Sequence, residues 1–86
     1  MASEVAMYKC PCCGFLTLSE QPPGTFEICP VCNWEDDAAQ AANPTLEGGA
    51  NRVSLEQARG NFARFGASSK DAIGAVRKPL PDEIPA

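Results

Sequence analysis

The sequence has no histidine and few aromatic residues: four phenylalanines, one tyrosine and one tryptophan in 86 residues. Histidine is the side chain that most often acts as a base near neutral pH, so its absence removes the usual means of activating a thiol or hydroxyl nucleophile. No other catalytic group stands out along the chain. These absences argue against an enzyme.

Long apolar runs are also missing. No stretch approaches the roughly 20 apolar residues that a membrane-spanning helix needs, and we therefore expect no contact with a membrane. The first nine residues contain neither a basic start nor an apolar segment, so the sequence predicts no secretory signal peptide. We expect a cytoplasmic protein.

Basic residues are scarce in the first half of the chain. Residues 1–50 carry one lysine and no arginine against seven acidic residues, and the whole chain has a formal net charge of −4. Nucleic-acid binding depends on Lys and Arg contacts to phosphates, which this half of the chain cannot supply. The composition therefore disfavours a nucleic-acid partner.

Cysteine, by contrast, is abundant, and four of the five cysteines form a repeated motif. The stretches Cys-Pro-Cys-Cys-Gly-Phe and Cys-Pro-Val-Cys-Asn-Trp each place two cysteines three positions apart, followed by a residue that tolerates positive φ and then by an aromatic residue. This spacing lets one tight turn aim two sulfurs at one point, and the proline presets the turn. We call these turns knuckle one (residues 10–15) and knuckle two (residues 29–34).

The two knuckles together give the pattern C-x₂-C-x₁₅-C-x₂-C, which lies within the spacing range of structural zinc sites. Four thiolates favour tetrahedral Zn²⁺, and iron is the main rival because soft four-sulfur sites suit both metals. Two disulfides or redox-active dithiols are the alternatives, but neither explains why the proline and the turn residue occur twice. We therefore predict one metal ion held by Cys10, Cys13, Cys29 and Cys32.

Cys12 is the cysteine that the repeat leaves over. The odd count argues against a complete disulfide framework, and closely spaced cysteines without a secretory signal favour a reducing compartment. Three interpretations of Cys12 are open: an inert packed side chain, a reactive thiol at the surface, and a residue that exchanges with a ligand during metal transfer or oxidation. The rarity of reactive cysteines favours the first.

The length of the chain predicts one domain. Its large apolar side chains are few, and a core of this size supplies only roughly 3–5 kcal/mol of stability. We therefore expect metal binding to be a condition of folding in the first half. We predict a disordered N-terminus over residues 1–6, a single zinc-ribbon-like domain over residues 7–80, and an extended proline-rich tail over residues 81–86.

The first half is expected to form a rubredoxin-like zinc ribbon. Residues 15–19 and 25–28 alternate between apolar and polar side chains, which predicts an antiparallel hairpin that returns knuckle two to knuckle one. Phe26 and Ile28 share the apolar side of this hairpin, and Trp34 packs over the metal site. Residues 7–10 form a short extended lead-in.

A short helix and a glycine loop are predicted after knuckle two. Asp36 or Asp37 would cap a helix over residues 38–42. The pair Gly48-Gly49 indicates either a plain flexible turn, which we favour, or a close backbone approach.

The main helix is predicted over residues 55–65, because Ser54 and Gln57 form a capping box ahead of an apolar stripe. Arg59 is expected on the solvated side of this helix. A second short helix is predicted over residues 70–76. The fold class is therefore a small α+β metal-bound domain, with a β-hairpin that carries two knuckles, one main α-helix and one or two short α-helices.

Several unrelated motifs occur in a fixed order between residues 8 and 81. They are Cys10-Pro11-Cys12-Cys13-Gly14, Leu16-Thr17-Leu18, Cys29-Pro30-Val31-Cys32, Trp34-Glu35-Asp36-Asp37, Gly48-Gly49-Ala50-Asn51, Val53-Ser54-Leu55, Ala58-Arg59 and Phe65-Gly66-Ala67-Ser68. Together they resemble the cysteine-rich CPCC family of small bacterial proteins. The resemblance implies a zinc-ribbon-like domain with its cysteines as metal ligands, and it implies no substrate.

Three functions from different classes fit these observations. The first is a non-enzymatic, zinc-stabilised module that presents a surface to a protein partner, around residues 34–37 and the edge at residues 51–52. The second is a rubredoxin-like electron-transfer or thiol-redox protein with iron at the same four sulfurs. The third is a thiol enzyme that uses Cys12, which we rank last because no base is available.

Overall fold

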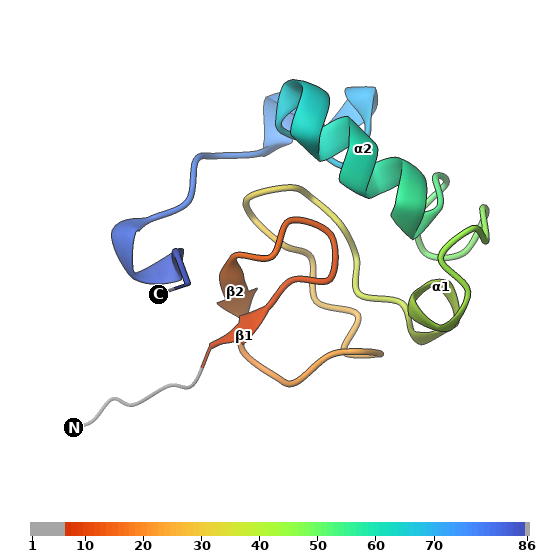
Figure 1. Cartoon of the computed structure of the whole chain (residues 1–86), viewed down its shortest axis with the longest axis horizontal. Coiled ribbons are helices and arrows are strands. Elements are labelled where there is room, and N and C mark those ends of the chain that lie inside the picture. Colours follow the sequence, from red (N-terminus) through yellow and green to blue (C-terminus); the bar gives the residue numbers. More distant parts are fainter. Residues whose placement is uncertain (1–6, 86) are drawn as a thin grey trace.

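The computed structural model describes residues 7–85, which contain both strands and helices (Figure 1). A two-stranded antiparallel sheet lies near the N-terminal end, and the longest helix packs across the loops that follow it. The predicted small α+β fold is confirmed, while the segment 1–6 lies outside the described residues. The elements are β1 (Tyr8–Lys9), β2 (Leu16–Leu18), α1 (Ala38–Ala42), α2 (Leu55–Phe65) and the 3₁₀ helices η1 (Lys70–Ala75) and η2 (Pro81–Glu83).

The sheet differs from the predicted hairpin. Strand β2 pairs with β1 and not with residues 25–28. Knuckle one is itself the turn of this hairpin, because the Gly14 N–H donates to the Cys10 carbonyl at 2.9 Å and the chain reverses there. Knuckle one is preset for this reversal by Pro11, which fixes its own φ, and by Gly14, which has a φ of 80°.

Residues 25–28 instead pair with the chain that leaves knuckle two. The Cys29 N–H donates to the Trp34 carbonyl at 3.0 Å, and the Asp36 N–H donates to the Glu27 carbonyl at 2.9 Å. Each knuckle is therefore the turn of its own short hairpin. Within residues 7–85, no backbone hydrogen bond joins the two hairpins.

The apolar side of residues 25–28 faces solvent. Phe26 is 60% exposed and Ile28 is 58% exposed. Phe26 also has a φ of 59°, a left-handed conformation that costs an ordinary residue about 1–2 kcal/mol. A bulky aromatic residue held in this region is a genuine outlier, and little burial of the ring offsets the strain.

Trp34 is buried beside the knuckles, with 1% of its surface exposed, as predicted. The chain then enters α1, whose N-cap is Asp37. Its Oδ1 accepts the N–H groups of Ala39 at 2.7 Å and Gln40 at 3.2 Å. Of the two caps that the sequence allowed, the structure has Asp37.

The loop at Gly48-Gly49 is exposed, but Gly49 approaches α1 closely, so the plain flexible turn that we favoured is wrong and the close backbone approach is correct. A Cβ atom on Gly49 would lie 2.8 Å from Asp37 Oδ2 and 2.8 Å from Gln40 Cδ. The next residue, Ala50, donates its N–H to Asp37 Oδ2 at 2.8 Å. Gln40 is fully buried at this contact. The loop therefore needs glycine for a close approach to α1.

Helix α2 has the predicted bounds and the predicted capping box. Ser54 Oγ accepts the Gln57 N–H at 3.1 Å, and Gln57 Oε1 accepts the Ser54 N–H at 2.9 Å. Phe62, on the inner face, packs edge-on against Phe15 of knuckle one with ring centroids 6.1 Å apart. No helix within residues 7–85 combines the length and apolar character required to cross a membrane.

The C-terminal segment folds back onto knuckle two. The Arg77 N–H donates to the Pro30 carbonyl at 3.1 Å, and the Arg77 guanidinium donates to both carboxylate oxygens of Glu83 at 2.8 and 2.9 Å. This ion pair lowers the pKa of Glu83. Part of the tail that was predicted to be extended therefore forms η2. The short helix predicted at residues 70–76 is the 3₁₀ helix η1.

We predict that Gly49→Ala lowers the free energy of unfolding by about 1–3 kcal/mol, because the added methyl group collides with well-packed atoms. Gly74→Ala is the matched control, since a Cβ on Gly74 meets nothing within 4 Å. Urea unfolding of both variants measures the difference. Equal stabilities for the two variants would contradict the close packing of this loop.

Candidate metal centre

The two knuckles have the same backbone hydrogen bonds. In each, the first cysteine carbonyl accepts the N–H of the turn residue, at 2.9 Å from Gly14 and at 2.7 Å from Asn33. Gly14 has a φ of 80° and Asn33 a φ of 70°, so both adopt the left-handed conformation that the repeated motif predicts. Two copies of one turn therefore present their sulfurs in the same way.

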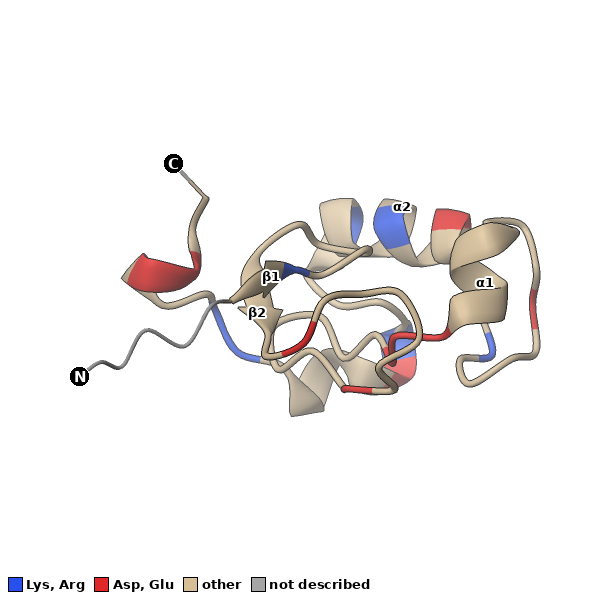
Figure 2. Cartoon of the chain, turned by 90° about the horizontal axis from the view of Figure 1, so that it is seen from below, with Lys and Arg blue, Asp and Glu red and all other residues tan. Residues whose placement is uncertain are grey.

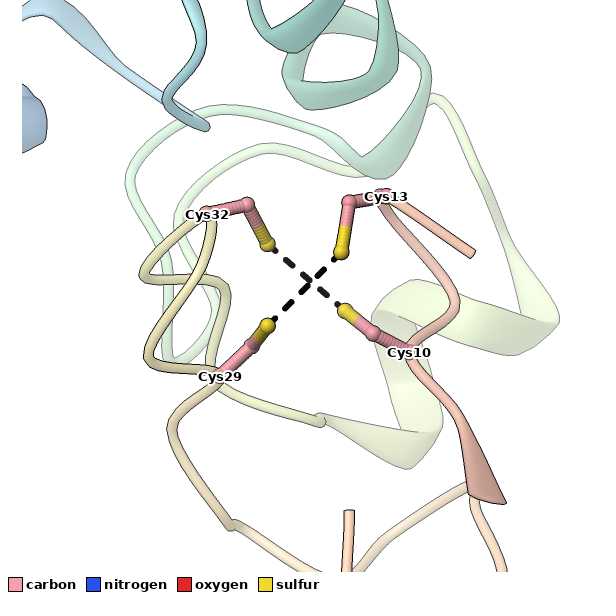
Figure 3. Close-up of side chains that lie close together, drawn as sticks. All are labelled: Cys10, Cys13, Cys29 and Cys32. Carbon is pink, nitrogen blue, oxygen red and sulfur yellow. Dashed lines mark hydrogen bonds between the residues drawn. The ribbon is translucent and has the colours of Figure 1, made fainter. Parts of the chain in front are cut away.

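The four predicted cysteines come together. Figure 3 shows Cys10 and Cys13 on one side and Cys29 and Cys32 on the other, with all four sulfurs pointing to a common centre. All four Sγ atoms lie within 4.8 Å of one another. The distance is 3.6 Å between Cys10 and Cys32 and 3.7 Å between Cys13 and Cys29.

These distances fit a tetrahedral metal site. Metal–sulfur bonds of about 2.3 Å place the sulfurs of a tetrahedron about 3.8 Å apart, close to the two shorter separations. A disulfide needs sulfurs about 2.05 Å apart, and all five cysteines are free. The donor set, four soft thiolates, suits zinc or iron. The residues present therefore fit a single bound ion.

The cluster is buried and needs a cation to be fully ionised. Cys29 and Cys32 are inaccessible to solvent, Cys10 is 2% exposed, and Cys13 is partly exposed. The pKa of the Cys29 thiol lies far below its usual range, mainly because of its hydrogen bond with Cys10. The pKa of the Cys32 thiol lies far above the usual range, and its hydrogen bond with Cys10 is again the main cause. Thiols in such contact share protons, and metal binding releases them.

Three of the four sulfurs also contact a hydrogen-bond donor outside the cluster. The N–H of Cys12 donates to Cys10 Sγ and the N–H of Trp34 donates to Cys32 Sγ, both at 3.4 Å. The Thr17 hydroxyl lies 3.0 Å from Cys29 Sγ. Such contacts orient metal ligands and stabilise their negative charge.

Sequence reasoning missed the role of Thr17. The alternation in Leu16-Thr17-Leu18 shows only that the threonine lies on the opposite face from the leucines. The face of β2 that lies toward the sulfurs depends on which strand β2 pairs with, and the predicted pairing was wrong. No feature of the sequence near Thr17 gives this contact.

The second half of the chain holds both knuckles by their backbone. Arg59 Nε donates to the Pro11 carbonyl at 2.9 Å. The sequence predicted only a solvated position for this arginine, and the structure adds a contact to knuckle one. The Ser68 N–H donates to the Cys32 carbonyl at 2.7 Å. Together with the Arg77 contact to knuckle two, these bonds tie α2 and the segments after it to the cysteine turns.

Cys12 lies outside the sulfur cluster that could hold an ion. It is 8% exposed and packs in the core with the other cysteines, Val31 and Trp34. This position supports the inert, packed interpretation of Cys12 over that of a thiol at the surface.

The fold and the cluster define a class of protein, a small α+β chain built around four converging cysteines. The model of the cysteine-rich CPCC family matches residues 8–83. The chain belongs to this family, which the order of its motifs predicted. A comparison with curated proteins gives no match.

We expect Cys29→Ser to lose bound metal and most of the folded structure, because it removes one of four ligands from a buried site. Cys12→Ser is the matched control and is expected to retain both, since Cys12 lies outside the cluster. Elemental analysis and an amide spectrum of each variant measure the two properties. Loss of metal from Cys12→Ser with retention by Cys29→Ser would overturn the ligand assignment.

We also expect Thr17→Val to weaken metal affinity by roughly tenfold, the lower end of the effect of losing an outer hydrogen-bond partner. Valine keeps the shape of threonine but cannot donate to Cys29 Sγ. Thr17→Ser keeps the hydroxyl and should bind metal almost as tightly as the native chain. Competition with a chromophoric chelator measures the affinities, and equal values for valine and serine would contradict a role for the hydroxyl.

Proposed function

We propose that the protein is a non-enzymatic zinc-binding structural domain that serves as a protein-interaction module. The observation that carries this proposal is the closed set of four converging sulfurs. Structural zinc sites have four protein ligands, whereas catalytic sites keep one position open for water or substrate. Four cysteines leave no such position. Zinc here stabilises the fold and does not act on a substrate.

The composition of the core supports a structural role for zinc. Apart from the cysteines, the buried members of the main cluster are four residues: Val31, Trp34, Leu55 and Ala58. A core this small needs an additional source of stability, and the free energy of zinc binding becomes folding free energy. Free cysteines persist in a reducing compartment, so we place the protein in the cytoplasm.

Part of the surface first expected to meet a partner is used inside the protein, whereas Arg52, at the edge of residues 51–52, is exposed. Trp34, Asp36 and Asp37 are buried. Asp36 Oδ2 accepts the N–H of Thr25 at 2.9 Å and its hydroxyl at 2.8 Å, and Asp37 caps α1. These three residues build the fold, so the interaction surface does not include their side chains.

Iron electron transfer is the second candidate, and one observation favours it. Donors contact three of the four sulfurs, and hydrogen bonds to sulfur tune the reduction potential of iron–sulfur sites. Cys13, the partly exposed ligand, would be the route for an electron. We rank this function second because the same contacts serve a zinc site equally well.

Metal analysis of protein purified from its native host separates the two functions. We expect one zinc ion per chain and no visible absorption, whereas a four-sulfur iron site is coloured and redox-active. Removal of zinc with a strong chelator is expected to abolish the dispersion of the amide spectrum, and added zinc should restore it. A coloured sample with iron in place of zinc, or a fold that persists in chelator, would contradict the proposal.

A further inference from the structure

The hairpin of knuckle two has one open backbone edge. Ile28 and Glu35 face each other as an antiparallel bridge. The bonds on either side of them join Asp36 to Glu27 and Cys29 to Trp34. In such a pair, the N–H and C=O groups of the two facing residues point outward, away from each other. The hairpin therefore offers one pair of outward groups on each edge.

The edge at Glu35 is closed by a side chain. Asn51 Oδ1 accepts the Glu35 N–H at 2.9 Å, and Asn51 Nδ2 donates to the Glu35 carbonyl at 2.8 Å. The amide of Asn51 thus takes the place of a neighbouring strand. On the opposite edge, no residue within 7–85 donates to the Ile28 carbonyl or accepts its N–H. We call the backbone groups of Ile28, with the side chains of Phe26 and Ile28, the Ile28 edge.

The side chains at this edge are those of a binding surface. Phe26 and Ile28 are the two most exposed large apolar residues in the described chain. Phe26 is held there in a strained backbone conformation, and residues in such conformations cluster at functional sites. Ile28 also borders a polar surface groove of about 540 Å³.

The charge around the edge selects its partner. Glu27 precedes Ile28 in the chain, and Glu35 faces Ile28 across the bridge, so an acidic residue lies next to Ile28 on each strand of this hairpin. Figure 2 shows acidic positions spread along the loops of this half of the chain, whereas α2 carries both signs, with Arg59 and Arg64 after Glu56. In the groove that Ile28 borders, Arg52 and Lys70 are balanced by Glu35 and Asp71, so the excess of negative charge comes from the loops. A second copy paired edge to edge would place acidic segments together. A basic chain complements the edge.

We propose that the Ile28 edge binds an extended segment of a partner protein, which adds a β-strand beside Ile28 and carries Lys or Arg residues between apolar ones. Main-chain hydrogen bonds to Ile28 supply the register. The apolar side chains of the segment contact Phe26 and Ile28, and its cations face Glu27. The inference rests on the proposed interaction function and names the surface and the partner.

A fluorescent peptide with the sequence Lys-Val-Lys-Val-Lys-Val-Lys, blocked at both ends, is the probe. Titration with the zinc-loaded full chain is expected to give saturable binding that weakens about tenfold from low to high salt. The same peptide with N-methyl valines cannot donate main-chain hydrogen bonds on that edge and should bind about tenfold more weakly or not at all. Equal affinity for the two peptides would overturn strand addition.

A charged substitution at the edge tests its position. Ile28→Lys places a cation at the edge and should weaken binding about tenfold, as lysine on an edge strand opposes pairing. Ile84→Lys is the matched control, because Ile84 is 54% exposed and lies on the C-terminal tail. The amide signal of Ile28 should shift on binding and exchange more slowly with solvent. Amide shifts confined to α2, or to groove residues other than Ile28, would overturn the assignment, and so would equal losses of binding in both variants.

Two further measurements separate this inference from the proposed function. Zinc content is measured in each sample, so a peptide that fails to bind a chain with one zinc ion overturns the Ile28 edge alone. A chain without zinc overturns the proposed function and the edge with it. Sedimentation should show a monomer, and a dimer that Ile28→Lys dissociates would assign the edge to a second copy and contradict the basic partner.

Discussion

Four sulfur atoms that converge on one point are the constraint on which the rest of the structure depends. Each pair belongs to a turn that closes its own hairpin, and no backbone hydrogen bond runs between the two hairpins in residues 7–85. Besides the bonds from Ser19 and Glu20 to the Glu27 carboxylate, the sulfurs and the Thr17 contact to Cys29 are the links between the two hairpins. Unscreened thiolates would repel at this distance, so the arrangement is stable only with shared protons or with a cation at the centre.

The second half of the chain packs against the two knuckles and holds them in position. Helix α2 lays its inner face on the knuckles, and three backbone carbonyls of the knuckles accept hydrogen bonds from Arg59, Ser68 and Arg77. These donors fix the turns from outside, whereas the metal would fix them from inside. Asn51 gives a further support through its side chain, which closes one hairpin edge in place of a neighbouring strand. The opposite edge of the same hairpin, at Ile28, has no such side chain across it in the described residues.

Local sequence patterns predicted the features that depend on residues close together in the chain, namely the cysteine turns and the helix bounds. The doubled Cys-Pro motif fixes both the turn and the aim of the sulfurs, so the four candidate ligands could be named. The bounds of α2 followed from Ser54, Gln57 and the apolar stripe, because capping is a contact between neighbours in the chain. The same logic limited the cap of α1 to Asp36 or Asp37, and the structure has Asp37.

Contacts between distant segments could not be predicted in this way. Alternation in residues 15–19 and 25–28 identifies extended chain but not its partner, so the hairpins were paired wrongly. Thr17 at Cys29, Arg59 at Pro11 and Arg77 at Pro30 join positions that only the folded chain brings together. Gly49 was misjudged for the same reason, since its neighbour across the gap is Gln40 of α1.

X-ray absorption at the metal edge of the natively purified protein tests the central claim most directly. The account predicts a zinc spectrum fitted by four sulfur neighbours at about 2.3 Å, without nitrogen or oxygen in the first coordination sphere. A shell containing oxygen or nitrogen, or a folded sample without a transition metal, would contradict it.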